Sequence, residues 1–317
     1  MIAYIIRRFS SMIPSLLLAS IIVFSFIHLI PGDPAQVMLG DMATPDQVQA
    51  LRVSMGLDRP IWVQYGMWLS GVLRGNLGTS IFFHQPVLDV IADRAETSLF
   101  LAVMSIIIVI LIGIPIGVLS AVRYNSFVDQ LFSGVSMIFA SIPTFWLGLN
   151  FMMFFSVRLG WFPTSGFPSV LESGDWSNLR YLVLPAVTLA APNSALIIRL
   201  TRSGMLDVSH ADYVRTARAK GLSEGSVNIR HIFRNSLISV VSALGFTFVA
   251  LVSGTVVTET VFSLPGIGRL VVESLLRRDY PTIQGIILVI ASIYMLINLL
   301  VDLSFAFLDP RIRYSRG

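Results

Sequence analysis

Six apolar stretches divide the sequence, and each is long enough to cross a lipid bilayer as a helix. Each holds about 18 or more residues with few or no charges, which is typical of transmembrane helices. The first five contain no charged residue, and the sixth contains only Asp302, near its end. The stretches are 12–30, 98–122, 131–157, 181–198, 237–257 and 283–308. The pattern predicts an all-α, polytopic membrane protein with six transmembrane helices.

The bilayer explains why these stretches are expected to be helices. Its core offers no hydrogen-bond partner to backbone amides, so a spanning segment must satisfy them internally. A closed barrel would need alternating strands of about ten residues, and that pattern is absent from the sequence. Several predicted spans are interrupted by proline, at Pro115, Pro143, Pro185 and Pro192 among others. They indicate either ordinary kinks or breaks beside a water-lined cavity, and the sequence leaves both open.

The connection between the first two spans, residues 31–97, is polar and carries helix signals of its own. Thr44, Pro45 and Gln47 combine an N-cap, a proline at the first helical position and a capping-box partner. A second short helix is expected to begin at Pro60. Its aromatic residues suit either the lipid headgroup layer or a docking protein. They are Trp62, Tyr65 and Trp68.

The connection between the fourth and fifth spans, residues 201–236, is predicted to form two helices joined by a glycine turn. Ser209 is the expected N-cap of the first helix, which ends at Lys220 and is terminated by Gly221. Ser223 is expected to start the second helix, which continues into the fifth span. Such a hairpin can insert as a knob into a partner protein, or it can be a solvated basic loop.

Composition agrees with a membrane protein, and the distribution of charge predicts how the chain is oriented in the bilayer. The chain is 55% hydrophobic and 13% charged, whereas typical soluble domains have about 25% charged residues. Segments on the N-terminal side of the bilayer hold most of the basic residues and few of the acidic ones. Basic residues favour the cytoplasmic side, so both termini are predicted to be cytoplasmic. Arg7 and Arg8 resemble an export signal, but five further spans and no A-x-A-like site favour an uncleaved first helix.

The sequence offers little chemistry of its own. It contains no cysteine, and its four histidines lie far apart: His28, His84, His210 and His231. It contains no nucleophile motif and no G-x-x-x-x-G-K-[ST] phosphate loop, so any ATP must be hydrolysed by another polypeptide. The positive-inside rule explains the basic loop better than nucleic-acid binding does. We therefore expect no catalytic residue, no metal site and no nucleic-acid partner.

One run in the basic loop resembles the cytoplasmic coupling loop of ABC-importer permeases. It reads DYVRTARAKGLSE from Asp212 to Glu224, and RNSL follows from Arg234. More narrowly, it is similar to the dipeptide/oligopeptide permease family, which includes glutathione and nickel subunits. Instead of the general Glu-Ala-Ala signature it has RTA at 215–217, as is typical of the peptide branch. Further matches are PGDP at 31–34, LDRP at 57–60, GNLG at 75–78, SIPTF at 141–145, LPA at 184–186, TETVFSLPGIGRL at 258–270, RDYP at 278–281 and DPRIRY at 309–314.

The resemblance implies a type I ABC importer permease fold in the bacterial inner membrane, and the first permease of a pair. It implies a second homologous permease, one or two ATPase subunits that hold ATP and Mg, and an extracytoplasmic solute-binding protein. The solute would be a di- or oligopeptide or a related small solute such as glutathione or nickel. The residues carried over to ATPase coupling are Asp212, Tyr213, Arg215, Ala217, Arg218, Gly221, Glu224, His231 and Arg234.

Ionisable groups at the ends of spans are candidates for the translocation pathway. Structural roles are favoured for His28 and Asp302. Glu259 lies where the fifth helix meets a Pro-Gly turn, and it is expected to form a gate with Phe262. The candidate pathway residues are Pro143, Phe145, Glu259 and Phe262.

The expected organisation has three parts. Residues 1–30 form the N-terminal segment and first helix, and residues 31–97 form an extracytoplasmic helical insert. Residues 98–317 form the core permease domain, with the coupling loop at 201–236. The alternative function is a self-sufficient carrier such as a secondary transporter, which should show paired ionisable groups at the midplane and internal repeats. An intramembrane enzyme would need catalytic groups within the spans.

Overall fold

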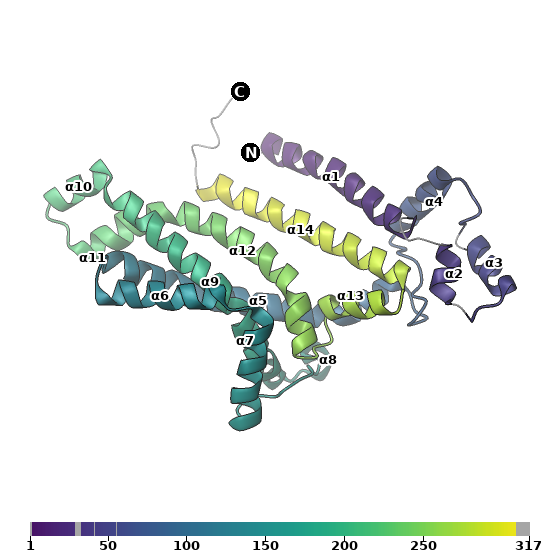
Figure 1. Cartoon of the computed structure of the whole chain (residues 1–317). Coiled ribbons are helices and arrows are strands. Elements are labelled where there is room, and N and C mark those ends of the chain that lie inside the picture. Colours follow the sequence, from purple (N-terminus) through teal and green to yellow (C-terminus); the bar gives the residue numbers. More distant parts are fainter. Residues whose placement is uncertain (1, 29–32, 41, 55, 309–317) are drawn as a thin grey trace. The chain divides into compact units, whose positions relative to one another are not determined.

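The computed structural model describes residues 2–28, 33–40, 42–54 and 56–308, and these are mostly helical (Figure 1). In this part of the chain, strand pairing is limited to one isolated bridge, between Thr79 and Pro86. The helices are α1 (Ile2–His28), α2 (Pro34–Leu39), α3 (Pro45–Ser54), α4 (Ile61–Leu73), α5 (Val87–Val122), α6 (Phe127–Ser141), α7 (Thr144–Phe151), η1 (Met152–Arg158), α8 (Val170–Ser173), η2 (Trp176–Leu179), α9 (Arg180–Ser209), α10 (Asp212–Ala219), α11 (Glu224–Ser226), η3 (Val227–Phe233), α12 (Arg234–Val261), α13 (Ile267–Leu276) and α14 (Tyr280–Leu308).

Among the described residues, the predicted spans are helical except at the break around Ile142 and Pro143, and the all-α polytopic prediction is confirmed. Among the described residues, four helices are long and apolar enough to cross a bilayer, and a bent pair makes a fifth candidate. The four lie on α5, α9, α12 and α14, and the bent pair is α6 with α7 and η1. The described apolar stretch of α1, Ser10–Ser25, is shorter than the eighteen residues that define a candidate span.

The third predicted span, 131–157, is broken rather than straight. α6 and the segment formed by α7 and η1 meet at an angle of 102°. Ile142 has an extended backbone, and Pro143 occupies the N-cap of α7. A proline disfavours the helical conformation in the residue before it and lacks the amide that the helix needs. Pro143 therefore marks a break, whereas Pro115 and Pro185 lie inside continuous helices.

The described chain divides into two compact units, the first made of residues 1–96 and 266–299. In this unit the capping box of α3 is confirmed. The Thr44 amide donates to Gln47 Oε1 over 2.9 Å, and the Gln47 amide donates to Thr44 Oγ1 over 3.4 Å. α4 begins after Pro60, as predicted.

Aromatic packing joins α4 to α1 in the same unit. The Phe24 ring lies 5.3 Å from the Tyr65 ring and 5.8 Å from the Trp68 ring, measured between centroids. The Ser20 and Tyr65 hydroxyls are hydrogen-bonded over 2.8 Å. Two of the three aromatic residues of α4 are therefore used within the chain, whereas Trp62 is 73% exposed.

A buried carboxylate at the start of α14 holds the loop that precedes α5. Asp279 is 1% exposed and accepts hydrogen bonds from the hydroxyls of Ser80 and Thr282 and from the amide of Ile81. Burying a carboxylate is costly unless such donors surround it. This network fixes the 78–86 segment to α14, although the two lie about 200 residues apart in sequence.

The second unit comprises residues 97–265 and 300–317, of which 309–317 lie outside the described part. α9 is its central helix and packs against α6, α7 and α12 (Figure 1). α5 approaches α9 closely because it carries glycines at the contact. A Cβ atom on Gly113 would lie 2.8 Å from Ile197, and one on Gly117 would lie 2.6 Å from Thr201.

Candidate coupling hairpin and pathway residues

The predicted coupling hairpin begins where α9 ends, and its first helix is shorter than the sequence indicated. α9 continues to Ser209, whose hydroxyl donates to the carbonyl of Leu206 over 2.7 Å. α10 starts at Asp212 with Ala211 at its N-cap and no side-chain cap. The predicted N-cap at Ser209 is therefore wrong, because α9 extends beyond its apolar stretch and uses that hydroxyl itself.

Gly221 turns the chain between α10 and α11, as predicted. Its φ of +79° lies in the left-handed region, which glycine enters without a Cβ clash. The Gly221 amide donates to the Arg218 carbonyl over 2.9 Å, and the Leu222 amide donates to the Ala217 carbonyl over 3.4 Å. These bonds satisfy carbonyls that a helix end leaves free. The turn therefore has a defined backbone geometry.

The two faces of α10 differ in burial. Val214 and Ala217 are buried in an apolar cluster with residues of α9 and η3. Tyr213 is 45% exposed, and the side chains of Asp212 and Arg215 are 99% and 73% exposed. The buried face fixes α10 to the ends of the membrane helices. The exposed face is left for solvent or for a partner protein.

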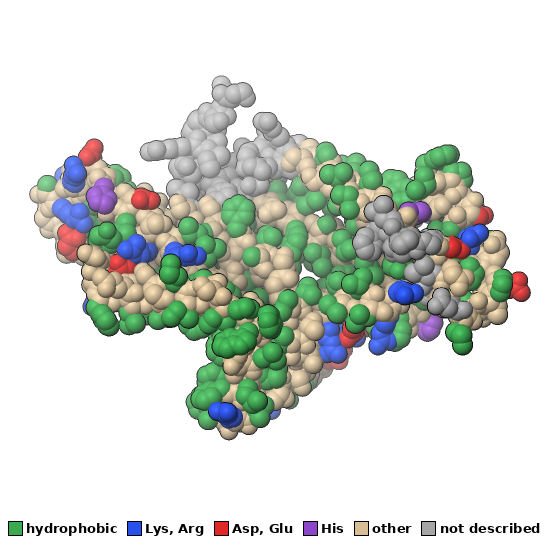
Figure 2. Space-filling model, in the orientation of Figure 1, with side chains coloured by type: hydrophobic (Ala, Val, Ile, Leu, Met, Phe, Trp, Pro, Cys, Tyr) green, Lys and Arg blue, Asp and Glu red, His purple; other side chains and the backbone are tan. Residues whose placement is uncertain are grey.

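An ion pair bridges the glycine turn. Arg218 Nε lies 3.0 Å from Glu224 Oε1, and Arg218 Nη2 lies 3.4 Å from Glu224 Oε2. Both side chains are well exposed, so the pair contributes at most about 1 kcal/mol to stability. Figure 2 shows charged side chains gathered at the end of the molecule formed by α10 and α11.

The residues carried over from the family resemblance are spread along this hairpin. Those from Asp212 to Glu224 lie around the turn, whereas His231 is half-buried in η3 and Arg234 is the exposed first residue of α12. Ala217 differs from the others, because it belongs to the buried cluster. The second helix starts after Ser223 and continues through η3 into α12, as predicted.

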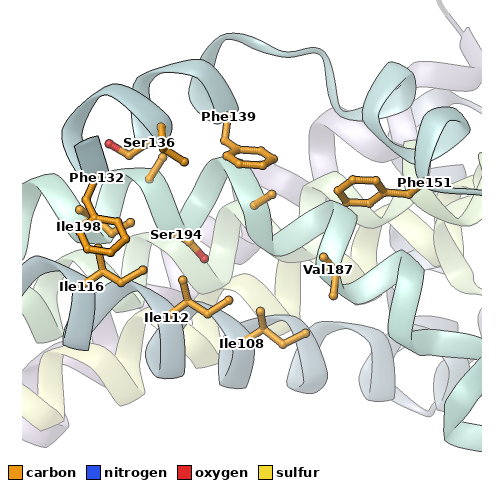
Figure 3. A pocket seen from close by; sticks show the side chains of 13 residues that line it. Ile108, Ile112, Ile116, Phe132, Ser136, Phe139, Phe151, Val187, Ser194 and Ile198 are labelled. Atoms are coloured by element: carbon orange, nitrogen blue, oxygen red, sulfur yellow. The ribbon is translucent and has the colours of Figure 1, made fainter. Parts of the chain in front are cut away.

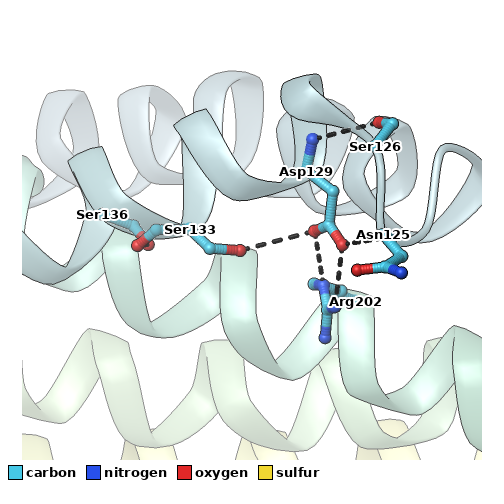
Figure 4. Close-up of polar contacts among 6 residues, drawn as sticks. All are labelled: Asn125, Ser126, Asp129, Ser133, Ser136 and Arg202. Carbon is cyan, nitrogen blue, oxygen red and sulfur yellow. Dashed lines mark hydrogen bonds and ion pairs between the residues drawn. The ribbon is translucent and has the colours of Figure 1, made fainter.

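A buried ion pair between α6 and α9 was not expected from the sequence. Asp129 is 3% exposed and binds Arg202 through two contacts, 2.6 Å to Nε and 2.8 Å to Nη2 (Figure 4). The Asn125 amide and the Ser133 hydroxyl also donate to this carboxylate. Two parallel N–H···O bonds fix both distance and orientation. The pair therefore sets how the start of α6 docks against α9.

The sequence carried only a weak signal for this pair. Asp129 lies in the first turn of α6, three residues after the Ser126 N-cap, which is an ordinary place for a carboxylate. Arg202 reads as one more basic residue of an inner loop. The two residues are 73 positions apart, and only the packing of α6 on α9 brings them together.

The structure places the candidate gate residues Glu259 and Phe262 in the interior of the second unit. Glu259 is fully buried and accepts a hydrogen bond from the Ser98 hydroxyl over 2.6 Å. Phe262 is 1% exposed and packs in the apolar core. A Cβ on Gly148 of α7 would lie 3.1 Å from the Phe262 ring. The end of α12 is thus closely packed against α7.

The other two candidate pathway residues lie at the break between α6 and α7. Pro143 is the N-cap of α7, and Phe145, in the first turn, is 51% exposed. Exposed apolar side chains continue along α7 and η1 (Figure 2). Phe262 therefore packs against α7, the helix that carries Phe145, whereas the Phe145 side chain itself is exposed.

An apolar cavity of 220 Å³ lies between α5, α6, α7 and α9 (Figure 3). Isoleucines of α5 face phenylalanines of α6 and α7 across it. Two serines also line it: the Ser136 hydroxyl donates to the Ser133 carbonyl, and the buried Ser194 hydroxyl has no hydrogen-bond partner among the described residues. A cavity with this lining suits apolar groups and lacks the charged groups that a metal or phosphate would need.

The remaining ionisable candidates give no further site. His28 Nε2 lies 3.1 Å from Gln64 Oε1, in keeping with a structural role. Among the described residues, no group of three or more His, Cys, Asp or Glu is arranged to hold a metal ion. The side chain of Asp302 and the motif residues 31–32 and 309–314 lie outside the described part.

The family model "Binding-protein-dependent transport system inner membrane component" matches residues 113–314. The corresponding N-terminal model matches residues 1–102.

Curated relatives match over the whole chain. A putative peptide transport system permease protein of Brucella abortus is 42% identical over 316 residues, covering 99% of this chain and 100% of the relative. A dipeptide transport system permease protein of Alkalihalophilus pseudofirmus is 40% identical over 333 residues, with the same coverage of both chains. A glutathione transport system permease protein of Salmonella typhimurium is 41% identical over 315 residues, again at 99% and 100% coverage.

A solved structure shares the fold. The inward-facing MetNI methionine ABC transporter matches with a TM-score of 0.58 at 19% identity, covering 69% of this chain and 96% of that chain. With matching helices, family models over both halves and relatives at about 40% identity, this chain belongs to the family of binding-protein-dependent transport system inner membrane components, the permeases of ABC importers whose ATP is hydrolysed by separate subunits.

Proposed function

We propose that this permease forms half of an import pathway for di- or oligopeptides or a related small solute such as glutathione. The full-length relatives named as peptide, dipeptide and glutathione permeases support this solute class. The other half of the pathway would be a second homologous permease, since one chain supplies a single coupling hairpin. An extracytoplasmic solute-binding protein would deliver the solute, and one or two ATPase subunits would drive transport.

The hairpin of α10 and α11 is the proposed ATPase contact. The observation that carries this proposal is that one face of α10 is buried and the other is exposed. The buried face, with Val214 and Ala217, ties it to α9 and η3. The exposed face presents Tyr213, Arg215 and Arg218. A rigid knob between two membrane helices transmits a push from a partner better than a loose loop does.

Both neighbours of the hairpin are long helices, so a displacement of α10 would reach the membrane core. α9 leads into the hairpin and α12 leads out of it through η3. The Asp129–Arg202 pair would carry the movement of α9 to α6. These contacts are one state of a cycle, and alternating access requires a second state with different contacts.

Glu259 and Phe262 are proposed to form the outer gate. Their position at the end of α12, packed against α7, supports a role in closing this end when α12 moves. A charge buried at such a point is a functional candidate in membrane proteins. The Ser98 hydroxyl donates a hydrogen bond to this carboxylate and would hold it in place when the gate is closed.

The test is to tag this chain, extract it gently from its native membrane and identify the proteins that co-purify. A second six-span permease together with one or two ATPases is expected, and peptide should stimulate ATP hydrolysis when the cognate binding protein is added. Recovery of the chain alone under several mild detergents, with transport intact after substitution of Gly221, would contradict the proposal and favour a self-sufficient carrier. Recovery of the complex without a peptide response would overturn only the solute class.

A further inference from the structure

A groove between α6 and α9 has a lining that changes from polar to apolar along its length. Its volume is 620 Å³, and it opens on the side of the α6–α9 contact opposite the apolar cavity. The lining residues that matter here are Ser133, Met137, Leu196, Arg199, Arg202 and Ser203. We propose that this groove binds an anionic phospholipid, with the phosphate at Arg199 and an acyl chain along Met137 and Leu196.

The charge of the groove favours an anionic ligand. Arg202 is committed to Asp129 through two hydrogen bonds, so its charge is compensated within the protein. Arg199 is exposed and forms no ion pair or hydrogen bond with the described residues. No acidic side chain lines the groove. The groove therefore carries one uncompensated positive charge.

The position of Arg199 along α9 also favours an anionic ligand. It lies one helical turn further into the membrane helix than Arg202, whose partner Asp129 is in the first turn of α6. Its helix neighbours in the groove are Leu196 and Leu200, which are 37% and 36% exposed. A cation at this depth needs a counter-ion or must reach the headgroup layer. A lipid phosphate supplies that counter-ion at the right level.

The order of polar and apolar residues along the groove favours a phospholipid. α6 and α9 run antiparallel, so Arg202 and Ser203 lie at one end of the groove and Met137 and Leu196 lie at the other. Met137 is 64% exposed, which leaves an apolar surface for a hydrocarbon chain. This order, cation and hydroxyls at the membrane surface and apolar side chains further in, matches the order of groups in a phospholipid. Basic pockets between membrane helices on the cytoplasmic side bind anionic headgroups. Assigning the lipid to the inner leaflet rests on the proposed orientation of the chain.

The experiment titrates the purified, assembled transporter with phosphatidylglycerol or phosphatidylcholine and counts bound lipids by native mass spectrometry. Arg199→Gln is expected to weaken phosphatidylglycerol binding about fivefold, the effect of one basic residue at an anionic surface. Arg199→Lys should keep most of the binding because it keeps the charge. Arg123→Gln is the matched control, since Arg123 is also exposed at this end but lies outside the groove.

Two results would overturn the proposal. One is unchanged binding in Arg199→Gln, and the other is an equal loss in Arg123→Gln, which would indicate diffuse surface charge. The binding assay does not depend on chain orientation or solute, so its failure would leave the proposed transport function standing.

A single introduced thiol can show whether a lipid or a protein occupies the groove. The chain has no cysteine, so Met137→Cys adds its sole thiol for a spin label. In lipid nanodiscs the label is expected to be relaxed by dissolved oxygen, which concentrates in the acyl region. A label shielded from oxygen, together with cross-linking of the unlabelled Met137→Cys thiol to the second permease, would instead make the groove a subunit interface and overturn the lipid assignment.

Discussion

Single residues decide two questions that the helices alone leave open. One is how α6 is docked against α9, which depends on the Asp129–Arg202 pair. The other is whether the buried carboxylate at the end of α12 has a role in transport. Both carboxylates are buried: Asp129 binds Arg202, and Glu259 accepts a hydrogen bond from the Ser98 hydroxyl.

Asp129→Ala is expected to destabilise the second unit. Removing one partner of a buried ion pair costs about 3–5 kcal/mol, and the effect should fall toward the lower end because Arg202 is partly exposed. Thermal unfolding of the purified transporter, followed by fluorescence-detected size exclusion, measures the loss. The exposed Asp207→Ala is the control and should change little. The double variant with Arg202→Ala should be less unstable than the sum of the single variants, and strict additivity would contradict a direct coupling.

Glu259→Gln tests the gate. The amide oxygen of glutamine still accepts the Ser98 hydrogen bond, so expression and melting temperature should be preserved. If the charge serves the cycle, transport should fall roughly 2- to 30-fold, the range of 0.5–2 kcal/mol seen for coupling residues. Solute uptake into proteoliposomes and basal ATPase activity are the measurements. Wild-type solute uptake and wild-type basal ATPase activity in Glu259→Gln would contradict a role of Glu259 in transport.

At the scale of elements, glycines set the turn of the hairpin and the spacing of α5 and α9. The two cases differ physically. Gly221 has free space around it but a left-handed backbone, whereas Gly117 has an ordinary helical backbone and neighbours in contact. The first position is limited by backbone conformation and the second by volume.

Gly221→Val should distort the turn between α10 and α11 and uncouple ATP hydrolysis from transport. A side chain in the left-handed region costs about 1–2 kcal/mol, more for a β-branched residue. Gly221→Asn should be nearly neutral, because asparagine tolerates this conformation. Gly225→Val controls for side-chain volume, since Gly225 is exposed and has no positive φ. The ratio of solute transported to ATP hydrolysed is the readout, and equal ratios in Gly221→Val and wild type would contradict the expected role of the turn.

Gly117→Ala should separate α5 from α9. The added Cβ would lie 2.6 Å from Thr201 Cβ and 2.8 Å from the Ile198 carbonyl oxygen, and that backbone atom cannot turn aside. Overpacking of this kind costs about 1–3 kcal/mol. The same change at Gly134 of α6 meets nothing within 4 Å and serves as the control. A lowered melting temperature in Gly117→Ala alone is the expected result, and equal melting temperatures would show that α5 can shift.

At the scale of the whole molecule, the charge pattern predicts the orientation of the chain in the membrane. Arginines at both ends of the hairpin predict that it is cytoplasmic, and the segment between η1 and α9 should then be outside. Because the chain has no cysteine, single thiols can report this without background.

Leu222→Cys and Trp161→Cys place thiols at positions that are 43% and 65% exposed, on opposite sides of the predicted membrane. In intact spheroplasts, a membrane-impermeant maleimide should label Trp161→Cys and should label Leu222→Cys only after lysis. The opposite pattern would reverse the orientation and with it the proposed ATPase contact.

Local sequence patterns were enough to predict the helical class, the capping box of α3, the glycine turn at Gly221 and the apolar stretches of α5, α9, α12 and α14. These features depend on local hydrophobicity and backbone preference, which neighbouring residues already encode. The sequence also marked Pro143 as an interruption, but only the tertiary structure showed that the helix breaks there with a bend of 102°.

Contacts between polar groups that are distant in sequence depend on tertiary packing. Asp129 and Arg202, or Ser80 and Asp279, come together because distant helices pack against each other, and no local pattern records that packing. The error at Ser209 has the same origin. Its hydroxyl was a plausible cap until α9 was seen to continue through it, supported by packing against α10 and η3 beyond the reach of its apolar pattern.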